Sequence, residues 1–503
     1  MGKVNNTVTN FTDKCNRFFG SLTLEKACRQ GKKKGFWNMR KVALHNLGCK
    51  VNAYETESMR RILEEAGYEI VPFEEQADVY VINTCSVTNM ADRKSRQMIH
   101  RARKRNPGSV VVAAGCYVQT AEEHVREDGA ADILIGNNKK HELADLLEHF
   151  FAEREKQKES MMPAQEERNA SCVLVENIAE DRIYEESGVN RAGEHTRAFV
   201  KVQDGCNQFC SYCIIPYARG RVRSRNPEHT LREVEALAAN GYREVVLTGI
   251  HLSSYGTDLN RQDTPAREEI SLLALVQKVH EIKGIERIRL GSLEPKIVTE
   301  DFVRALSKLP KVCPHFHLSL QSGCDATLKR MNRKYTCEEY AKGCGLLRKY
   351  FTHPAITTDV IVGFPGETED EFAVTRKFLK SIGFFEIHIF RYSRREGTPA
   401  AGMEHQIPEQ VKAERSDALF TDLSRMNREF LDWYSGREVE VLMEEEISVE
   451  GKKYFLGHTG EYVKAAVHLP DGASRNLANK LVKGRVASVL TEDVLLLEFM
   501  EEE

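Results

Sequence analysis

Residues 204–225, DGCNQFCSYCIIPYARGRVRSR, place three cysteines in one short polar loop. Cys206, Cys210 and Cys213 follow a C-x3-C-x2-C spacing, and a basic run begins directly after them. A single free cysteine is commonly a small buried hydrophobic residue. Three thiols crowded into a polar loop cannot all be packing residues, so the spacing predicts a metal or cluster site.

The chemistry of this loop favours an iron–sulfur cluster. Three thiolates hold three irons of a 4Fe-4S cluster, which usually takes four cysteine ligands. The loop has no fourth cysteine, and an iron without a protein ligand leaves room for a small molecule, as an open catalytic metal does. Zinc is the alternative. Zinc requires a distant fourth ligand, because the loop offers neither a second C-x2-C nor a histidine pair.

Composition narrows the class of protein. The chain has 503 residues, of which 41% are hydrophobic and 29% charged, and its net charge is -3. The length and composition are typical of a soluble protein with two to four domains. The net charge is not basic, so it does not by itself indicate a nucleic-acid partner. No apolar run is long enough to span a bilayer and no secretory signal is present, so we predict a cytoplasmic protein without a membrane partner. Thirteen cysteines in that compartment favour metal ligands or free thiols over disulfides.

The cysteine loop lies in a region, residues 196–435, where strand-like and helical segments alternate. Six apolar, strand-like runs occur at 198–203, 244–249, 287–292, 315–320, 356–363 and 385–393. Six βα units in a row predict an α/β fold, an open, partial (βα)6 TIM-like barrel. The chemistry of such barrels lies on loops after the strand carboxyl ends. The cysteine loop follows the first of the six strands.

Residues 39–150 show a second alternation and are predicted to form an N-terminal parallel α/β domain. Cys49, Cys85 and Cys116 each directly follow an apolar strand. The carboxyl ends of parallel strands meet at one edge of a sheet, so we predict that these three cysteines share a metal site. The alternative is three unrelated buried cysteines.

Three other regions complete the domain plan. Residues 1–38 lack a sustained period, and we interpret them as an extension that is not translated, with Met39 as the first residue; a flexible basic tail is the alternative. Residues 151–195 are predicted to be a charged linker, in which Cys172 has no role. Residues 436–503 are predicted to be an all-β, OB-like barrel of five strands.

The loop resembles that of the radical S-adenosylmethionine (radical SAM) superfamily, in which an aromatic residue, here Tyr212, precedes the last cysteine. Seven motifs in the same order resemble the methylthiotransferases: LGCKVN (47–52), NTCSVT (83–88), AGCY (114–117), the 204–225 stretch, TGIHLSSYG (248–256), HLSLQSG (317–323) and DVIVGFPGE (359–367). The resemblance runs from Met39 to near Glu498. It implies that the central region is a radical SAM barrel and that the C-terminal module is a TRAM domain that binds RNA.

This resemblance implies two 4Fe-4S clusters and S-adenosyl-L-methionine as cofactors. The radical-generating cluster would be held by Cys206, Cys210 and Cys213. The sulfur-delivering cluster would be held by Cys49, Cys85 and Cys116. A 5′-deoxyadenosyl radical would remove hydrogen from C2 of an adenine, and a methylated sulfur would replace it, with a second S-adenosylmethionine as methyl donor. An electron donor such as flavodoxin or ferredoxin and a sulfur source would be partners of a monomeric enzyme.

The resemblance also indicates a branch of the family. Two branches modify adenosine beside the anticodon of tRNA, and a third modifies an aspartate of a ribosomal protein. LGCKVN and the 204–225 stretch resemble the branch that acts on N6-threonylcarbamoyladenosine, because the isopentenyladenosine branch has a GCQMN-like motif and the ribosomal-protein branch has GCPKN. A non-catalytic RNA-binding iron–sulfur redox sensor is the alternative from another class. The intact cysteine loop and six-strand barrel argue against a sensor.

Further site residues follow from the same motifs and from charge. By resemblance, the cofactor would be bound by Tyr212, Thr248, Gly249, Ser319, Gln321, Gly363 and Glu367. Taken singly, without the resemblance, each is better interpreted as an ordinary turn or hydrogen-bonding residue. Basic runs near the cysteines predict phosphate contacts by Arg219, Arg221, Arg223, Arg225, Arg101, Arg103 and Lys104. The alternative is a solvated charged face. In the acidic C-terminal module, the candidate RNA face lies around Lys452, Lys453, Tyr454 and Phe455.

Overall fold

The computed structural model describes residues 40–159, 172–189, 196–261, 270–469 and 476–499. The expectation for residues 1–38 lies outside these ranges. By their contacts, residues 41–503 form one unit. Among the described helices, none is both long enough and apolar enough to cross a membrane.

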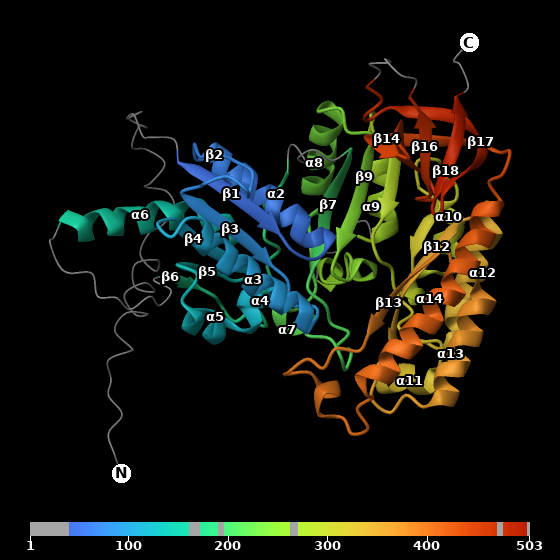
Figure 1. The fold of residues 1–503 in the computed structure, drawn as a ribbon, viewed down its shortest axis with the longest axis horizontal. Coiled ribbons are helices and arrows are strands. Elements are labelled where there is room, and N and C mark those ends of the chain that lie inside the picture. The colour runs from blue at the N-terminus through green and yellow to red at the C-terminus, as the bar shows by residue number, and fades with distance from the viewer. Residues whose placement is uncertain (1–39, 160–171, 190–195, 262–269, 470–475, 500–503) are drawn as a thin grey trace. The chain divides into compact units, whose positions relative to one another are not determined.

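The N-terminal region is a six-stranded, all-parallel sheet with strand order β2-β1-β3-β4-β5-β6 (Figure 1). Its strands are β1 (Lys41–Asn46), β2 (Glu69–Ile70), β3 (Val79–Thr84), β4 (Val110–Gly115), β5 (Ile133–Ile135) and β6 (Cys172–Leu174). Its helices are α2 (Lys50–Glu65), α3 (Asn89–Arg105), α4 (Cys116–Thr120), α5 (Glu122–Asp128) and α6 (Leu143–Glu159). Apolar residues of α2 and α6 pack on one face of the sheet and those of α3 and α5 on the other. β3 and β4 are buried along their whole length, as expected for parallel strands covered on both faces.

The segment expected to be a charged linker contributes to this sheet. Cys172 begins β6, which pairs with β5 as the sixth strand. Further along, the Tyr184 hydroxyl donates to the Lys201 carbonyl at 2.8 Å, so the chain after β6 is also packed. β6 spans three residues within a charged stretch. So short a strand shows no period-two pattern, and the sequence therefore did not reveal it.

The central region confirms the six predicted strands. They are β7 (Arg197–Asp204), β9 (Glu244–Gly249), β10 (Arg287–Leu290), β11 (His315–His317), β12 (Ala355–Val362) and β13 (Glu386–Arg391). β7, β9 and β10 pair in parallel, as do β11, β12 and β13, and single bridges join the two sets. The short strand β8 (Arg223–Ser224) pairs antiparallel with β7. This arrangement is the expected open parallel barrel.

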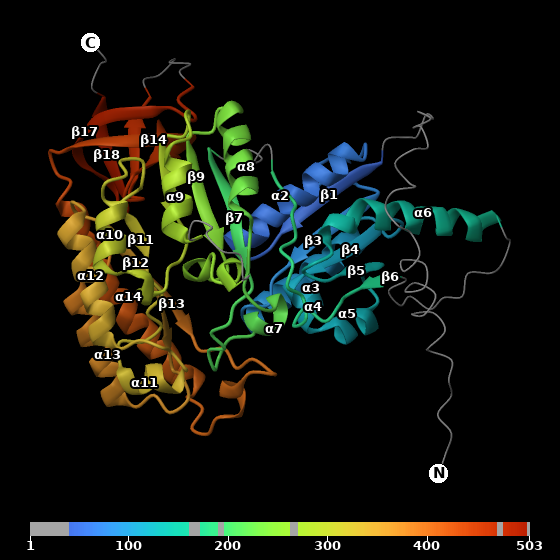
Figure 2. The ribbon, with the colours of Figure 1, turned by 180° about the vertical axis from the view of Figure 1, so that it is seen from behind.

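Helices cover the outer face of the barrel strands (Figure 2). The α-helices of this region are α7 (Ile215–Arg219), α8 (Pro227–Ala239), α9 (Leu272–His280), α10 (Glu300–Leu306), α11 (Asp325–Arg330), α12 (Cys337–Tyr350), α13 (Glu369–Ile382) and α14 (Glu409–Asp432). The 3-10 helices among the described residues are η2 (Lys140–Glu142), η3 (Leu252–Ser254), η4 (Leu259–Arg261), η5 (Pro295–Ile297) and η6 (Pro399–Gly402). Val200, Leu247 and Ile288 point into the core that these helices share. Because side chains alternate along a strand, the neighbouring polar residues point to the opposite, inner face of the barrel.

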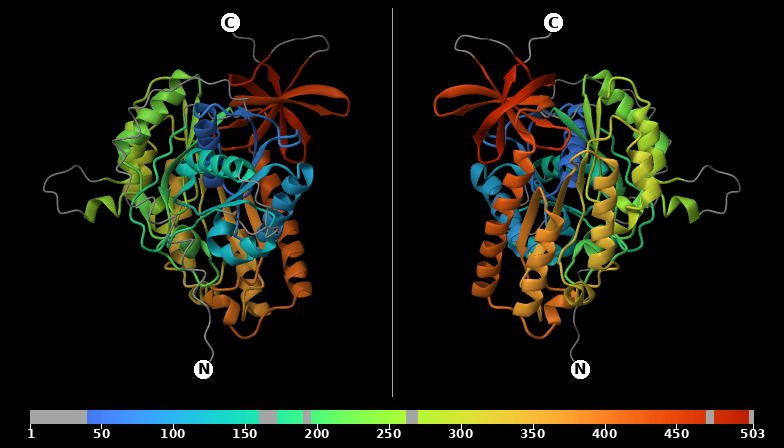
Figure 3. Two further views of the ribbon diagram at one scale, coloured as in Figure 1. Left: turned by 90° about the vertical axis from the view of Figure 1, so that its left-hand side faces the viewer. Right: turned by 90° about the vertical axis from the view of Figure 1, so that its right-hand side faces the viewer.

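The C-terminal region is a closed five-stranded barrel with order β14-β15-β16-β18-β17 (Figure 3), as predicted. Its strands are β14 (Glu438–Val449), β15 (Lys452–Thr459), β16 (Lys464–His468), β17 (Leu481–Thr491) and β18 (Val494–Phe499). Tyr454 and Phe455 are 7% and 3% exposed and pack inside this region. They are unavailable for stacking on RNA bases, so the predicted RNA face is wrong at these two positions.

The turn between β15 and β16 reaches the inner face of the central barrel. The ring of Tyr462 stacks on His315 with centroids 5.0 Å apart, and the guanidinium groups of Arg197 and Arg289 lie 4.8 and 4.7 Å from its centre. Arg289 also donates to the Gly460 carbonyl at 2.8 Å. Arg197 and His315 are the first residues of β7 and β11, so this turn lies at the amino ends of the barrel strands.

Candidate active site

The cysteine loop begins at Gly205, directly after β7. Gly205 has φ of +71°, and a Cβ at this position would lie 1.8 Å from the Arg221 carbonyl oxygen. Only glycine tolerates both conditions. This close approach allows the Cys206 amide to donate to the Gly220 carbonyl at 3.0 Å. Gly205 therefore allows a tight loop, and this loop places its cysteines at the carboxyl end of β7.

The thiols of this loop are partly or fully buried. Cys210 is buried, while Cys206 and Cys213 are half-buried. Burial raises the pKa of Cys206 to about 11 and that of Cys213 to about 12. A bound cationic metal favours the thiolate form that burial alone disfavours. Three soft ligands on one loop, without a fourth, fit a cluster that keeps one iron open.

Arg333 contacts this loop, and the sequence analysis did not identify it. Its Nη1 donates to Cys210 Sγ at 3.2 Å, and its Nη2 lies 3.5 Å from Glu294. Glu294 also accepts from the Gln208 side chain at 3.0 Å and pairs with His251 at 3.3 Å. Arg333 follows α11 and is 123 residues from Cys210. No local spacing could have revealed this contact.

The second group of cysteines is assembled from three strand ends. Cys49 is the N-cap residue of α2, Cys85 follows β3, and Cys116 begins α4. A Cβ on Gly48 would lie 2.7 Å from Cys85 Sγ, so the first two loops touch. Burial, with Cys116 and Cys49 nearby, raises the pKa of Cys85 to about 11. The structure thus brings these cysteines together at the common edge of the sheet.

Asparagine side chains fix the loops that carry these cysteines. Asn52 Nδ2 donates to the carbonyls of Leu47 and Thr84, at 2.7 and 2.9 Å, and so joins the loop before Cys49 to the end of β3. Asn137 Nδ2 lies 3.5 Å from Cys116 Sγ and donates to the Ala218 carbonyl at 2.7 Å. Because Ala218 belongs to α7, this second asparagine connects the two cysteine groups.

Arg219 connects the two groups more directly. Its Nε lies 3.4 Å from Cys116 Sγ, and its terminal nitrogens bind Glu55 at 2.6 Å and Asp204 at 3.2 Å. Glu55 is also paired with Lys140 and Lys201. Burial raises the pKa of Asp204, but its cationic neighbours outweigh this effect and hold the pKa well below its usual range. A buried ionic network therefore joins the N-terminal domain to the cysteine loop.

The predicted RNA contacts are wrong for three of the four arginines beside the loop. Arg219, Arg223 and Arg225 are 0%, 1% and 3% exposed. Arg223 donates to Asn138 at 3.0 Å, and Arg225 Nε pairs with Glu186 at 2.8 Å.

These arginines bind neighbouring protein groups, because buried charges require partners. Arg221 alone of the four is exposed, and its guanidinium lies 4.5 Å from the centre of the Phe209 ring.

The basic residues of α3 divide in a similar way. Arg101 and Lys104 are exposed, as are Arg93, Lys94 and Arg96. Arg103 instead pairs with Asp132 at 2.5 Å and donates to the Ser109 carbonyl at 2.8 Å. Arg103 thus stabilises its own domain, and its prediction as a phosphate contact is corrected.

The predicted cofactor-binding residues lie at or after strand carboxyl ends. Thr248 and Gly249 end β9, and a Cβ on Gly249 would lie 2.8 Å from Gln203 Oε1. Ser319 and Gln321 follow β11; Gln321 has φ of +72°, a strained conformation of the kind found at functional sites. Gly363 follows β12 with φ of +71°.

Two other predicted cofactor residues pack within the loops themselves. Glu367 is 2% exposed; it accepts from the Gly363 amide at 2.6 Å and pairs with Arg415 at 2.8 Å. Its carboxylate closes the turn, so its prediction as a cofactor ligand is corrected to a structural role. The Tyr212 ring packs edge-on against Phe364 with centroids 6.4 Å apart.

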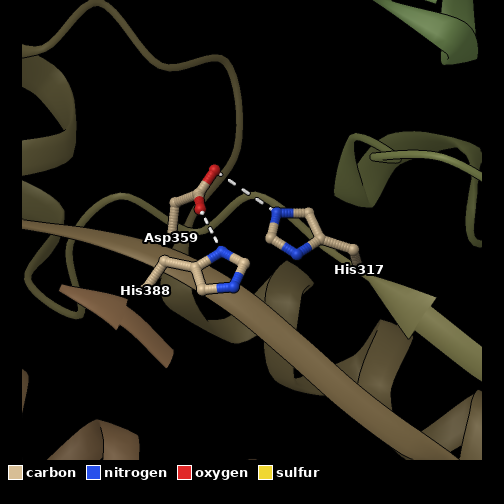
Figure 4. A group of neighbouring side chains, drawn as sticks. All are labelled: His317, Asp359 and His388. Carbon is tan, nitrogen blue, oxygen red and sulfur yellow. Dashed lines mark hydrogen bonds and ion pairs between the residues drawn. The ribbon is translucent and has the colours of Figure 1, made fainter. Parts of the chain in front are cut away.

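Polar side chains meet on the inner face of β11, β12 and β13 (Figure 4). Asp359 Oδ1 is 3.1 Å from His388 Nδ1, and Asp359 Oδ2 is 3.3 Å from His317 Nε2. Within the described part of the chain, this is the only group of three or more His, Cys, Asp or Glu residues whose ligand atoms all lie within 4.8 Å of one another. The outer imidazole nitrogens face Thr357 at 3.0 Å and Glu386 at 3.5 Å. The imidazole nitrogens of His317 and His388 and the Asp359 carboxylate therefore all have polar partners within this group of side chains.

Comparisons with known proteins agree with this architecture. Residues 41–136 match the family described as "Uncharacterized protein family UPF0004", and residues 200–379 match the "Radical SAM superfamily". The chain is 39% identical over 450 residues to the threonylcarbamoyladenosine tRNA methylthiotransferase MtaB of Bacillus subtilis, covering 89% of this chain and 94% of that one. It is 40% identical to the protein of the same name from Aquifex aeolicus, covering 81% and 93%.

Two further comparisons concern substrate and fold. The tRNA-2-methylthio-N(6)-dimethylallyladenosine synthase of Acetivibrio thermocellus is 35% identical, with 93% of this chain and 92% of that one covered. Among solved structures, the radical S-adenosylmethionine methyltransferase TsrM of Kitasatospora setae aligns with a TM-score of 0.51 at 17% identity, over 72% of this chain and 77% of that one. The last comparison supports the fold alone.

Proposed function

This chain belongs to the radical S-adenosylmethionine methylthiotransferases, and we propose that it adds a methylthio group to C2 of N6-threonylcarbamoyladenosine beside the anticodon of tRNA. It is an enzyme whose cofactors are two 4Fe-4S clusters and S-adenosylmethionine. Two relatives named for threonylcarbamoyladenosine share 39% and 40% identity with it and a third shares 34%, while a relative named for dimethylallyladenosine shares 35%. The two highest of these identities belong to relatives named for threonylcarbamoyladenosine, which supports that substrate.

The observation that carries the mechanism is the pairing of two cysteine groups across one buried ionic network. In our proposal, one cluster is held by Cys206, Cys210 and Cys213. The other is held by Cys49, Cys85 and Cys116. When bound, these groups and S-adenosylmethionine supply a 5′-deoxyadenosyl radical and a transferable sulfur. The loops at the ends of β9, β11 and β12, with Thr248, Gly249, Ser319, Gln321 and Gly363, are proposed to hold S-adenosylmethionine.

The chain's own residues hold the reacting groups in place. Arg333 donates to the Cys210 sulfur and Arg219 lies within hydrogen-bond reach of the Cys116 sulfur. Hydrogen bonds to ligand sulfurs are one of the factors that set the potential of iron–sulfur clusters. Arg219 also fixes α7 against α2 through Glu55. Protein contacts thereby hold the two cysteine groups, which would carry the clusters, in place relative to each other.

The RNA surface in this proposal is smaller than the basic runs suggested. It comprises the exposed side chains of Arg221 and of α3, namely Arg93, Lys94, Arg96, Arg101 and Lys104. The C-terminal barrel is proposed to be a TRAM domain. A reductant such as flavodoxin or ferredoxin, a sulfur source, a monomeric state and a cytoplasmic location complete the proposal.

Mass spectrometry of tRNA nucleosides from cells with and without this gene tests the function. We expect the methylthio derivative of threonylcarbamoyladenosine to disappear without the gene, while that of dimethylallyladenosine persists. The opposite pattern would assign the chain to the dimethylallyl substrate. Loss of neither mark would reject both tRNA substrates.

A further inference from the structure

Two buried nitrogen donors on the inner face of the barrel have no hydrogen-bond partner, and an exposed ammonium is among their charged neighbours. Arg197 Nη1 and His315 Nδ1 are buried and have no hydrogen-bond partner. Lys50 is exposed, and within the described residues its ammonium makes no hydrogen bond or ion pair. Its charged neighbours are two arginines and two glutamates, namely Arg289, Arg197, Glu244 and Glu386. His315 in turn has Lys50 and Arg197 among its charged neighbours. The three residues come from α2, β7 and β11.

The nearby carboxylates are already occupied. Glu244 accepts from Arg289 at 2.8 Å, and Glu386 pairs with His388 at 3.5 Å. Glu444 is shared between Arg197 Nη2 at 3.2 Å and His458 at 2.7 Å. Each of these carboxylates thus already has a cationic partner, and within the described part of the chain none of them accepts a hydrogen bond from Arg197 Nη1, His315 Nδ1 or Lys50. A buried donor without an acceptor carries a desolvation cost, which a ligand with acceptor oxygens relieves.

The surroundings favour an anionic ligand with more than one oxygen. An ammonium and a guanidinium form strong charge-assisted hydrogen bonds to carboxylates. His315 is 6% exposed, and Tyr462 stacks on its ring, so the third donor is held in place. Arg289, fixed by Glu244 and by the Gly460 carbonyl, adds positive charge behind them. A hydrocarbon group placed here would leave the donors unpaired.

We propose that Lys50, Arg197 and His315 form an anion subsite that binds the carboxylate of the substrate's N6-threonylcarbamoyl group. The inference rests on the proposed function, whose substrate carries that carboxylate, whereas a dimethylallyl group carries none. Lys50 directly follows Cys49, so this member of the subsite lies beside a proposed ligand of the sulfur-delivering cluster, while Arg197 and His315 begin their strands deeper in the barrel. Binding the N6 substituent there positions the same adenine ring for reaction at C2.

The test measures binding of anticodon stem-loop RNAs to the anaerobically reconstituted holoenzyme. One RNA carries N6-threonylcarbamoyladenosine, and a second carries the same group with a neutral carboxamide in place of the carboxylate. We expect wild-type enzyme to bind the carboxylate RNA about 10- to 100-fold more tightly than the carboxamide RNA. Lys50→Gln should abolish most of this preference, and Lys50→Arg should restore part of it.

Lys349→Gln is the matched control, because Lys349 is an exposed lysine of α12 that pairs with Glu300 at 2.6 Å. It removes the same charge and should keep the full preference. The iron content of each variant shows whether Lys50→Gln still holds both clusters. If Lys50→Gln does not hold both clusters, the comparison of the two RNAs on wild-type enzyme decides whether the carboxylate is recognised.

Equal binding of the two RNAs by wild-type enzyme overturns the subsite. So does a full preference in iron-loaded Lys50→Gln. Failure of the proposed function looks different: the wild-type enzyme would methylthiolate a dimethylallyladenosine stem-loop and leave the threonylcarbamoyl stem-loop unmodified. The binding comparison and the reaction assay therefore separate the two failures.

Discussion

Arg219 Nε lies 3.4 Å from Cys116 Sγ, although the two residues belong to different domains and different cysteine groups. Arg219 ends α7, directly after the radical loop, and Cys116 begins α4 of the N-terminal domain. The same guanidinium binds Glu55 and Asp204. The Arg219 side chain thus connects the loop that carries Cys206, Cys210 and Cys213 to Cys116, a proposed ligand of the other cluster.

Replacing Arg219 should destabilise this junction. Arg219→Met leaves Glu55 and Asp204 buried with fewer cations, and breaking a buried ion pair costs about 3 kcal/mol of unfolding free energy. Urea unfolding followed by circular dichroism measures the effect as a lower midpoint. Arg221→Met, two residues away and exposed, should change the unfolding free energy by less than about 0.5 kcal/mol. Equal losses in the two variants would refute a special role for the buried network.

Gly205→Ala should remove the radical cluster selectively. The new Cβ would clash with the Arg221 carbonyl at 1.8 Å, in addition to the cost of φ at +71°. We expect iron to fall from about eight to about four atoms per chain and 5′-deoxyadenosine formation to stop. Gly383→Ala is the control: its φ is +65° but a Cβ there meets nothing within 4 Å. That variant should keep both clusters at a stability cost of about 1 kcal/mol.

Alanine at the cysteines should separate the two cluster functions. Cys206→Ala is expected to lose about four irons and the cleavage of S-adenosylmethionine. Cys116→Ala is expected to lose the other four irons, retain 5′-deoxyadenosine formation, and release no methylthio product. Cys344→Ala, a buried cysteine outside both groups, should retain all of the iron. Iron analysis and product chromatography distinguish these outcomes; cleavage lost from both single variants would contradict separate roles.

The network around His388 predicts a pH dependence. Hydrogen bonds to Asp359 and Glu386 raise the pKa of His388 to about 10, from an ordinary value of 6.5. The folded state therefore binds this proton more tightly than the unfolded state. The resulting stabilisation is fully present below about pH 6.5 and is lost as the pH rises through about 10. We expect the difference in Tm between wild type and His388→Gln to shrink over that window, and a difference that widens would disprove the interpretation.

Binding of tRNA should depend steeply on salt. Contacts with about four to six phosphates give a slope near -3 to -5 in a plot of log affinity against log salt concentration. Because Lys104 is exposed and Arg103 is held by Asp132, Lys104→Gln should reduce the magnitude of this slope by about 1, and Arg103→Gln should act on stability instead. Fluorescence anisotropy at several salt concentrations measures both slopes. A flat response would exclude phosphate contacts as the source of affinity.

Much of the fold could be predicted because its signals are local. Each of the six barrel strands is a short apolar run between helical segments, and Cys49, Cys85 and Cys116 each directly follow such a run. The closed C-terminal barrel was predicted from alternating residues and turn signals. β6 was missed because three residues in a charged stretch carry too short a pattern.

The burial and the partners of charged side chains were the hardest features to predict. Arg219 and Arg221 are neighbours in one basic run, yet the first is buried and the second exposed. The sequence shows equal charges at both positions. Their different roles depend on Glu55, which lies 164 residues from Arg219 along the chain.

The sequence alone determined the two sets of three cysteines, the strand ends that carry them and the family to which the chain belongs. These features depend on residue type, spacing and short-range periodicity. Only the tertiary structure decided which cations are bound by protein carboxylates and which remain exposed to solvent, as Arg221 does. The physical reason is that an ion pair is a contact between groups distant in sequence, and burial makes the choice of partner decisive for each charge.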